Sequence, residues 1–273
     1  MRTPRTIRAL EDFGRIRLSR NFFMRDFLYS DIATMERFAN LPDDPDLAIA
    51  AGRGLCENLL EPLQATFGRI AIRSAYRSAE VNGFGNAHGN SCASNEADRA
   101  YHIWDQRSRD GGMGAMATIV IPWLIDKHAE GVEWPAMAWW IHDHLPYSEL
   151  QFPKLLAFNI GWHELPRRRI TSFVAPRGLL TKPGMANHAG DHSQFYPASR
   201  RFVRTCPDAS AATGPDIVRS FVGAGQCSTS FAGFWGSPMF WSCWRCCPPA
   251  RCRWCRNTSN RWSTALRRPI PRH

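Results

Sequence analysis

The sequence predicts one α+β domain over about residues 18–205, preceded by a short extension, 1–17, and followed by a segment of different character, 206–273. Hydrophobic residues make up 44% of the chain and aromatic residues 12%, which is enough to bury a core. Helix-like and strand-like stretches follow one another without the regular strand–helix–strand order of a doubly wound sheet. These observations together favour an α+β fold.

The first half of the domain predicts helices followed by a strand. Apolar residues within 19–40 are spaced as in one or two short helices with a buried aromatic face. Asp46 is expected to cap a helix over about 46–66, and Gly68 is expected to end it. Residues 69–74 then alternate apolar and polar side chains, as a half-buried strand does.

The second half predicts a loop and then more helices and strands. Residues 83–95 are rich in Gly, Asn and Ser, which indicates the loop. The elements expected after it are a helix at 95–104, a strand at 118–121, a helix at 122–127, an aromatic-rich helix at 134–144 and a strand at 158–163.

The last part of the chain differs sharply in composition from the rest. From Ile217 to His273 it holds nine Arg and no Asp or Glu, and six of the nine cysteines lie there too. No helical or strand period is visible in it, so we expect 206–273 to be disordered or translated out of frame. The alternative is a zinc site built from two CxxC pairs, Cys243–Cys246 and Cys252–Cys255.

Charge and hydropathy limit the classes of partner. The basic end of the chain accounts for nearly all of the net charge of +10, so nucleic-acid binding is only an alternative that rests on that segment. No apolar run approaches the ~18 residues of a membrane helix. The basic N-terminus lacks the apolar stretch of a secretory signal, so a cytoplasmic or phage-delivered protein is expected, with no membrane partner.

One stretch carries a resemblance to a known family. Leu60-Glu-Pro-Leu63 and Phe67-Gly-Arg-Ile70 lead into Ile72-Arg-Ser-Ala-Tyr-Arg-Ser-Ala-Glu-Val-Asn82. This order resembles the zinc D-Ala-D-Ala carboxypeptidases of bacteria and phages, whose fold is shared with the hedgehog signalling domain. The resemblance covers about residues 18–170, and it implies a small antiparallel sheet flanked by helices.

The resemblance also implies a catalytic Zn²⁺ held by His, Asp and His. The family places its first two ligands in a Ser-x-His-x-x-Gly-x-Ala-x-Asp segment, whereas residues 90–98 here contain no His. The nearest candidates are His102 and Asp105, three residues apart and so on one face of a helix. His163 on the closing strand is the third candidate ligand.

Two further residues are candidates for catalysis. Glu164 would be the general base that takes and returns a proton of the zinc-bound water. Arg77, in the Tyr-Arg-Ser turn, would bind the terminal carboxylate of the substrate, as its family counterpart does.

Structural roles remain open for the same residues. His102 and Asp105 could be an exposed helical pair, and Arg77 could brace its turn. His142 or His144 is an alternate ligand, although the two diverge on a helix. His188 and His192 are expected to be polar surface residues in a loop.

The function predicted is a zinc-dependent peptidase acting on peptidoglycan stem peptides, of the D-Ala-D-Ala carboxypeptidase or endopeptidase type. The alternative is an inactive homologue that serves as a binding module or as a structural module of a phage. The absence of a His in the expected ligand segment supports that alternative.

Overall fold

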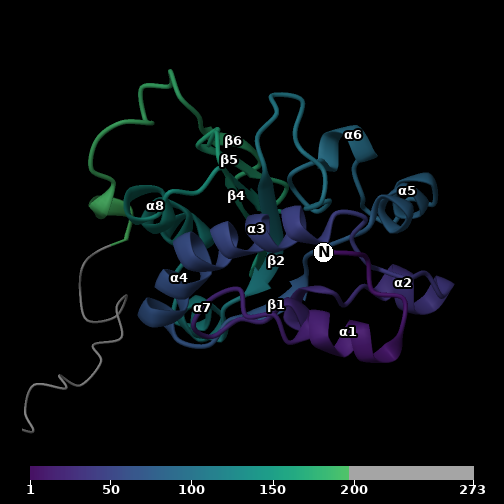
Figure 1. Cartoon of the computed structure of the whole chain (residues 1–273). Coiled ribbons are helices and arrows are strands. Elements are labelled where there is room, and N and C mark those ends of the chain that lie inside the picture. Colours follow the sequence, from purple (N-terminus) through teal and green to yellow (C-terminus); the bar gives the residue numbers. More distant parts are fainter. Residues whose placement is uncertain (197–273) are drawn as a thin grey trace, which may run out of the picture. The chain divides into compact units, whose positions relative to one another are not determined.

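Six strands form one mixed sheet in the order β1-β2-β4-β3-β5-β6 (Figure 1). The structure, a computed structural model, describes residues 1–196. The chain divides into a unit of residues 1–213 and a second unit of residues 214–273. The expectations for 206–273, including the two CxxC pairs and the basic nucleic-acid footprint, therefore lie outside the described residues.

The elements have the following bounds. The strands are β1 (Ala71–Ser74), β2 (Gly114–Val120), β3 (Glu149–Phe152), β4 (Ala157–His163), β5 (Arg169–Ser172) and β6 (Gly178–Thr181). The α-helices are α1 (Ile7–Gly14), α2 (Asp31–Glu36), α3 (Pro45–Leu55), α4 (Glu61–Phe67), α5 (Ala79–Ala87), α6 (Asn95–Asp98), α7 (Pro122–Ala129) and α8 (Trp134–His144). Short turns are η1 (Met24–Phe27) and η3 (Ser193–Phe195), both 3-10, and the π-helical η2 (Cys56–Leu60).

The central strands β2 and β4 have one buried face and one face that borders a cavity. In their antiparallel register Ala117 pairs with Ile160 and Met116 with Gly161. Ala117 and Ile160 are fully buried under α3, which crosses both strands (Figure 1). Because side chains alternate along a strand, Met116 and Asn159 point to the opposite face.

Helix α3 lies very close to β4, and a glycine makes this possible. A Cβ at Gly54 would lie 2.4 Å from ring atoms of Trp162 on β4. The indole therefore packs directly on the helix backbone. This contact fixes the distance between the helix and the sheet, and so the depth of the core.

The first 17 residues belong to the same unit. Phe13 of α1 is buried to 1% exposure. The N-terminal ammonium pairs with Asp46, and the Thr3 hydroxyl donates a hydrogen bond to the Pro42 carbonyl at 3.0 Å. The predicted extension is thus packed against the loop before α3 and the start of that helix.

Several predicted elements are confirmed. Strands β1, β2 and β4 lie where strands were expected at 69–74, 118–121 and 158–163, and α8 has the predicted bounds. Trp134, Trp139 and Trp140 of α8 are all buried. The mixed helix and strand content is confirmed as well.

Other local predictions were wrong for identifiable reasons. The helix expected at 95–104 ends at Asp98, because Arg99 has an extended ψ of 134° and Ala100 a positive φ of 58°. The N-cap of α3 is Asp44 instead of Asp46, because Pro45 fits the first helical position and Asp44 accepts from Leu47 N.

The sheet is also larger than predicted, and it is not purely antiparallel. Strands β3, β5 and β6 were not expected, and each has only four residues. Strand β3 pairs with β4 antiparallel and with β5 parallel. The chain passes from β3 through β4 and returns to the other edge of β3, which makes that second pairing parallel.

Within the described part of the chain, every helix is too short or too polar to cross a lipid bilayer.

Candidate functional site

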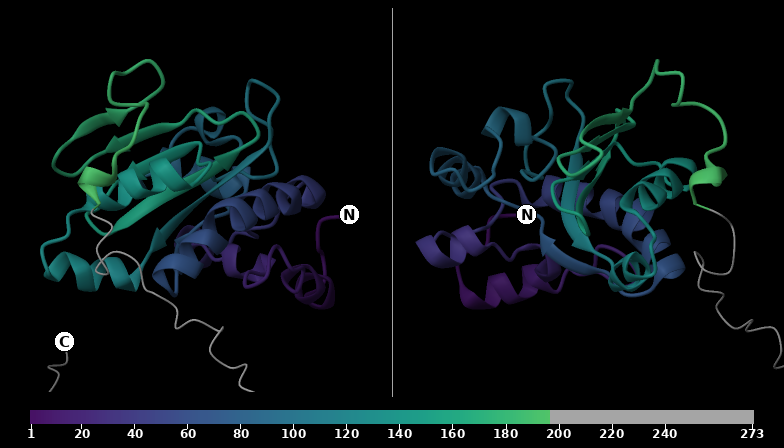
Figure 2. Two further views of the ribbon diagram at one scale, coloured as in Figure 1. Left: turned by 90° about the vertical axis from the view of Figure 1, so that its left-hand side faces the viewer. Right: turned by 180° about the vertical axis from the view of Figure 1, so that it is seen from behind.

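A cavity of about 920 Å³ opens on the face of the sheet that points away from α3. Its floor is formed by strand residues, and its wall by the segment 91–110 with α6, which stands beside the sheet (Figure 2). We call this cavity the cleft. Its charged lining consists of Arg77, Arg99, Arg109, Arg167, Arg169, Glu96, Asp98 and Asp110.

Strand register brings the floor residues together. Gly161 of β4 pairs with Met116 of β2 on one side and with Glu149 of β3 on the other. Glu149 in turn pairs with Arg169 of β5. Side chains in register across a sheet share one face, so Met116 and Arg169 line the cleft on the same side of the sheet, and Glu149 lies buried between their strands.

A second row lies two residues along the same strands. The Asn159 amide donates to Gln151 Oε1 at 3.1 Å, and the Thr118 hydroxyl donates to Asn159 Oδ1 at 2.6 Å. Asn159 and Gln151 line the cleft. The floor therefore offers amide groups whose orientation is fixed by hydrogen bonds.

His102 stands on the wall of the cleft, and its side chain is held in one tautomer. Its Nδ1 lies 2.7 Å from the Ala75 carbonyl, which can only accept, so Nδ1 carries the proton. Nε2 then presents a lone pair. Burial, aided by the nearby Arg77 guanidinium, lowers the pKa of His102 to about 3, so the ring is neutral near neutral pH.

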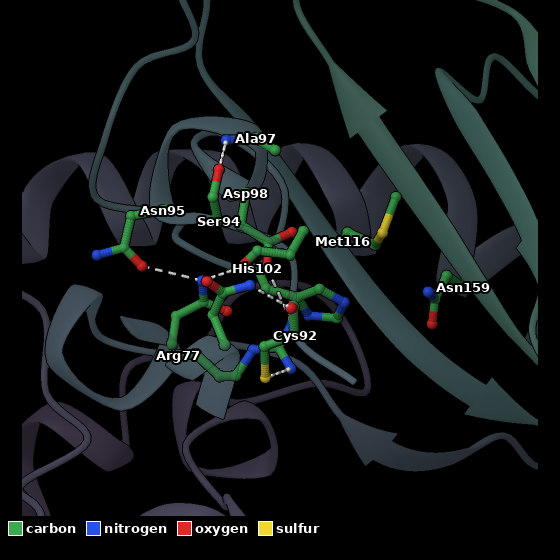
Figure 3. Close-up of polar contacts among 12 residues, drawn as sticks. Arg77, Cys92, Ser94, Asn95, Ala97, Asp98, His102, Met116 and Asn159 are labelled. Carbon is green, nitrogen blue, oxygen red and sulfur yellow. Dashed lines mark hydrogen bonds and ion pairs between the residues drawn. The ribbon is translucent and has the colours of Figure 1, made fainter. Parts of the chain in front are cut away.

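Arg77 holds the wall together instead of pointing freely into the cleft (Figure 3). Its backbone N–H donates to the His102 carbonyl at 2.8 Å. Its guanidinium forms an ion pair with Asp98 at 3.3 Å and donates to Cys92 Sγ at 3.1 Å. Both partners come from the segment 91–98, so Arg77 braces the segment that closes the cleft.

Asp98 and Cys92 are shielded by this arrangement. Burial raises the pKa of Asp98, while the Arg77 guanidinium opposes that rise. Burial also raises the pKa of the Cys92 thiol. The thiol is therefore protonated near neutral pH, which is the weakly nucleophilic form.

A buried carboxylate supports the far side of the floor. Glu149 has no exposed surface, and its Oε2 accepts from Arg169 Nε at 3.0 Å. Its Oε1 accepts from the Tyr101 hydroxyl at 3.3 Å. Burial and the neighbouring Glu149 raise the pKa of Tyr101 to about 12, so this hydroxyl donates throughout the physiological range.

The predicted ligand Asp105 does not line the cleft. Its Oδ2 accepts from the Asp43 N–H at 2.7 Å, on the side of the loop before α3. Burial raises the pKa of Asp105, while the hydrogen bond from the Asp43 N–H opposes that rise. Because 99–105 is a turn and not a helix, the three-residue spacing does not place Asp105 on the same face as His102.

The predicted residues His163 and Glu164 are engaged elsewhere. His163 Nδ1 accepts from the Leu165 N–H at 2.9 Å, so its Nε2 carries the proton and faces the Ser108 hydroxyl at 3.1 Å. Glu164 Oε2 accepts from the Met113 N–H at 2.7 Å and lies 3.5 Å from Arg107. Both side chains fasten the end of β4 to the segment 107–113.

A group that could hold a metal ion lies at the end of α8. One ligand atom each from His142, Asp143 and His192 lies within 4.8 Å of the other two. It is the one such group of His, Cys, Asp and Glu among residues 1–196, so His102, Asp105 and His163 do not come together in this way. His142 was an alternate ligand in the prediction, and His192 was expected at the surface but is 5% exposed.

The structure adds cleft residues that sequence reasoning did not single out. They are Asp98, Tyr101, Gln151, Asn159, Arg167 and Arg169. Asn159 could have been found, because it is two residues from Gly161 and four from His163 on a predicted strand and so shares their face. The residues of β3 and β5 could not, since those strands were not recognised.

Comparisons with known proteins give no match. A scan against protein-family models, a search of curated proteins and a search of solved structures each found none for this chain.

Proposed function

We propose that this protein is a binding module for short peptides that end in a carboxylate, with peptidoglycan stem peptides as the class that the family resemblance suggests. One observation carries the proposal: five guanidinium groups line the cleft against three carboxylates. Within the proposal, the sheet with α3 across one face and the cleft on the other is the hedgehog/DD-peptidase arrangement.

The cleft offers both charge and hydrogen bonds to such a ligand. Arg109 and Arg167 are exposed lining residues, so their guanidinium groups can reach a carboxylate and bind it in a bidentate manner. The neutral His102 offers an acceptor for a peptide N–H. Asn159 and Gln151 offer amides on the floor for the rest of the backbone.

Calorimetric titration of the full chain with a stem peptide ending in D-Ala-D-Ala tests this proposal. We expect one peptide bound per chain, and weaker binding of the same peptide with an amidated C-terminus. Arg109→Ala and Arg167→Ala should each weaken binding by about tenfold or more, since a charge-assisted pair contributes about 1.5–3 kcal/mol. Arg53→Ala on the exposed side of α3 is the matched control.

Two outcomes would overturn the binding proposal. One is equal affinity for the free and the amidated peptide, because the carboxylate would then not be recognised. The other is equal weakening by Arg109→Ala and by Arg53→Ala, which would mean that net charge and not the cleft attracts the peptide.

The second candidate is the zinc-dependent peptidase. It is favoured by His102, because a metal-bound histidine usually donates its other ring N–H to a carbonyl or carboxylate, as His102 Nδ1 does to the Ala75 carbonyl. The other two expected ligands do not fit as they lie here, because the His163 lone pair is taken by Leu165 and Asp105 turns toward Asp43. These contacts favour the binding proposal over the peptidase proposal.

Release of D-alanine separates the two candidates. A peptidase would release D-Ala from the stem peptide in a zinc-dependent reaction that His102→Ala abolishes. The binding module would bind the peptide and leave it intact in the presence of added Zn²⁺.

A further inference from the structure

We propose that His142, Asp143 and His192 bind one divalent transition-metal ion, with Zn²⁺ as the best chemical match, and that this ion joins the segment 182–196 to α8. The ion would be structural, and the site is separate from the residues that line the cleft. The proposal does not depend on the peptide-binding function.

The donor groups come from two parts of the chain that meet at the end of α8. His142 and Asp143 are in its last turn, and His192 follows β6 by 11 residues. Their ligand atoms lie within 4.8 Å of one another. Tetrahedral Zn²⁺ with bonds of about 2.0–2.1 Å sets its ligands about 3.3 Å apart. The 2.7 Å contact between His192 Nδ1 and Asp143 Oδ1 would therefore widen slightly, and any longer separation would contract.

His192 is oriented as a metal-bound histidine is. Its Nε2 faces the Asn187 carbonyl at 3.0 Å and must donate to it. Its Nδ1 faces Asp143 Oδ1 at 2.7 Å. A ring nitrogen that donates to a carbonyl leaves the other nitrogen to bind the ion, and here that other nitrogen already lies beside a carboxylate oxygen.

Asp143 is held from its other oxygen. Oδ2 accepts from the Tyr196 hydroxyl at 2.5 Å and from the His192 backbone N–H at 3.0 Å. These two hydrogen bonds hold the carboxylate in one orientation. Oδ1 is thereby directed at the position between the two histidines.

His142 supplies the third donor. Its Nδ1 lies 2.7 Å from the Tyr147 hydroxyl, and its Nε2 lies 2.8 Å from the His188 carbonyl. Binding through His142 Nε2 would require the tautomer with the proton on Nδ1, which would then donate to the Tyr147 oxygen, and Nε2 would give up its contact with the His188 carbonyl. A proton shared by His192 Nδ1 and Asp143 Oδ1 would go to solvent, because the ion would take its place.

The donor side chains are largely buried, and an aromatic ring packs against one of them. His142 and His192 are each 5% exposed, and the Trp139 ring stacks on His192 with centroids 4.2 Å apart. The two imidazoles lie nearly perpendicular, with centroids 5.1 Å apart. Imidazole nitrogens and carboxylate oxygens are among the donors that bind Zn²⁺ in proteins.

Zinc titration of the full chain against a chromophoric chelator tests the proposal. The background carries Cys243→Ser and Cys252→Ser, which removes one thiolate from each CxxC pair. We expect one Zn²⁺ per chain and a rise in the thermal midpoint on adding it. His192→Ala and Asp143→Asn should each weaken affinity by more than about 100-fold. Tyr196→Phe should weaken it by about 10-fold, because it removes the hydroxyl that orients the Asp143 carboxylate.

The control is His88→Ala, an exposed histidine outside the group, which should leave zinc affinity unchanged. Circular dichroism checks that each variant is folded, and Asp143→Asn keeps the side-chain shape if His192→Ala does not fold. The proposal fails if no Zn²⁺ binds to the folded chain. It fails equally if His192→Ala and Asp143→Asn bind zinc as the parent does, since the contacts would then be a metal-free hydrogen-bonded network.

Discussion

The guanidinium of Arg168 lies over the ring of Tyr147, 4.4 Å from its centroid, while it donates to the carbonyls of His142 and Leu145. These carbonyls belong to the last turn and the C-cap of α8 and have no partner within the helix. A single side chain thus closes the end of α8 and covers the tyrosine that orients His142.

Removal of Arg168 is expected to weaken this end of the helix. Arg168→Ala should lower the free energy of unfolding by about 2–4 kcal/mol, from two charge-assisted hydrogen bonds and a cation–π contact. Denaturant unfolding measures the change, and the exposed Arg177→Ala should have an effect within about 0.5 kcal/mol. Equal effects of the two substitutions would contradict this role for Arg168.

The contact between Gly54 and Trp162 gives a second expectation. Gly54→Ala places a methyl 2.4 Å from the indole and should destabilise the protein by about 1–3 kcal/mol, despite the better helix propensity of Ala. Gly83→Ala in α5 is the matched control, because its nearest neighbour would lie at 3.4 Å. That control should be neutral or stabilising by up to about 1 kcal/mol, and the same thermal or chemical unfolding assay compares the two.

The buried neutral His102 predicts that the free energy of unfolding falls at acid pH. Burial lowers its pKa to about 3 in the folded chain, against the ordinary histidine value of 6.5, so between these pH values the unfolded chain binds a proton that the folded chain does not. The contribution of the neutral His102 to the free energy of unfolding is complete above about pH 6.5. It is lost as the pH falls toward 3, by up to about 1.4 kcal/mol per pH unit.

His102→Asn tests this sensitivity, because an amide can still donate to the Ala75 carbonyl. The free energy of unfolding of this variant should fall less steeply between pH 6.5 and pH 4 than that of the parent chain. An unchanged slope would show that other groups cause the acid sensitivity.

The ion pair of Glu149 and Arg169 predicts that removing Arg169 alone destabilises the protein more than neutralising both partners does. Arg169→Ala leaves the fully buried Glu149 carboxylate with only the Tyr101 hydroxyl as a partner. The free energy of unfolding should fall by about 2–4 kcal/mol. This is less than for a pair in which both side chains are buried, because Arg169 is partly exposed. Adding Glu149→Gln to Arg169→Ala should recover part of that loss. A double-mutant cycle by denaturant unfolding measures the coupling, and strictly additive effects would contradict it.

The sequence indicated the local structure wherever an apolar or aromatic run was present. Helix α8 and strands β2 and β4 were predicted from such runs at 134–144, 118–121 and 158–163. Strands β3, β5 and β6 were not, because their residues, ELQF, RITS and GLLT, form no such run. The helix predicted at 95–104 failed where Ala100 adopts a positive φ that no pattern announced.

For the candidate site as well, the sequence indicated some features and the tertiary structure decided the others. Sequence alone identified His102, His142 and Arg77 as residues of interest, because His and Arg side chains carry chemistry whatever their position. Only the tertiary structure decided which side chains meet. Strand register set Glu149 beside Arg169, and the fold of the segment after β6 set His192 beside Asp143. Such pairings depend on contacts between residues 20 to 49 positions apart, which no local spacing encodes.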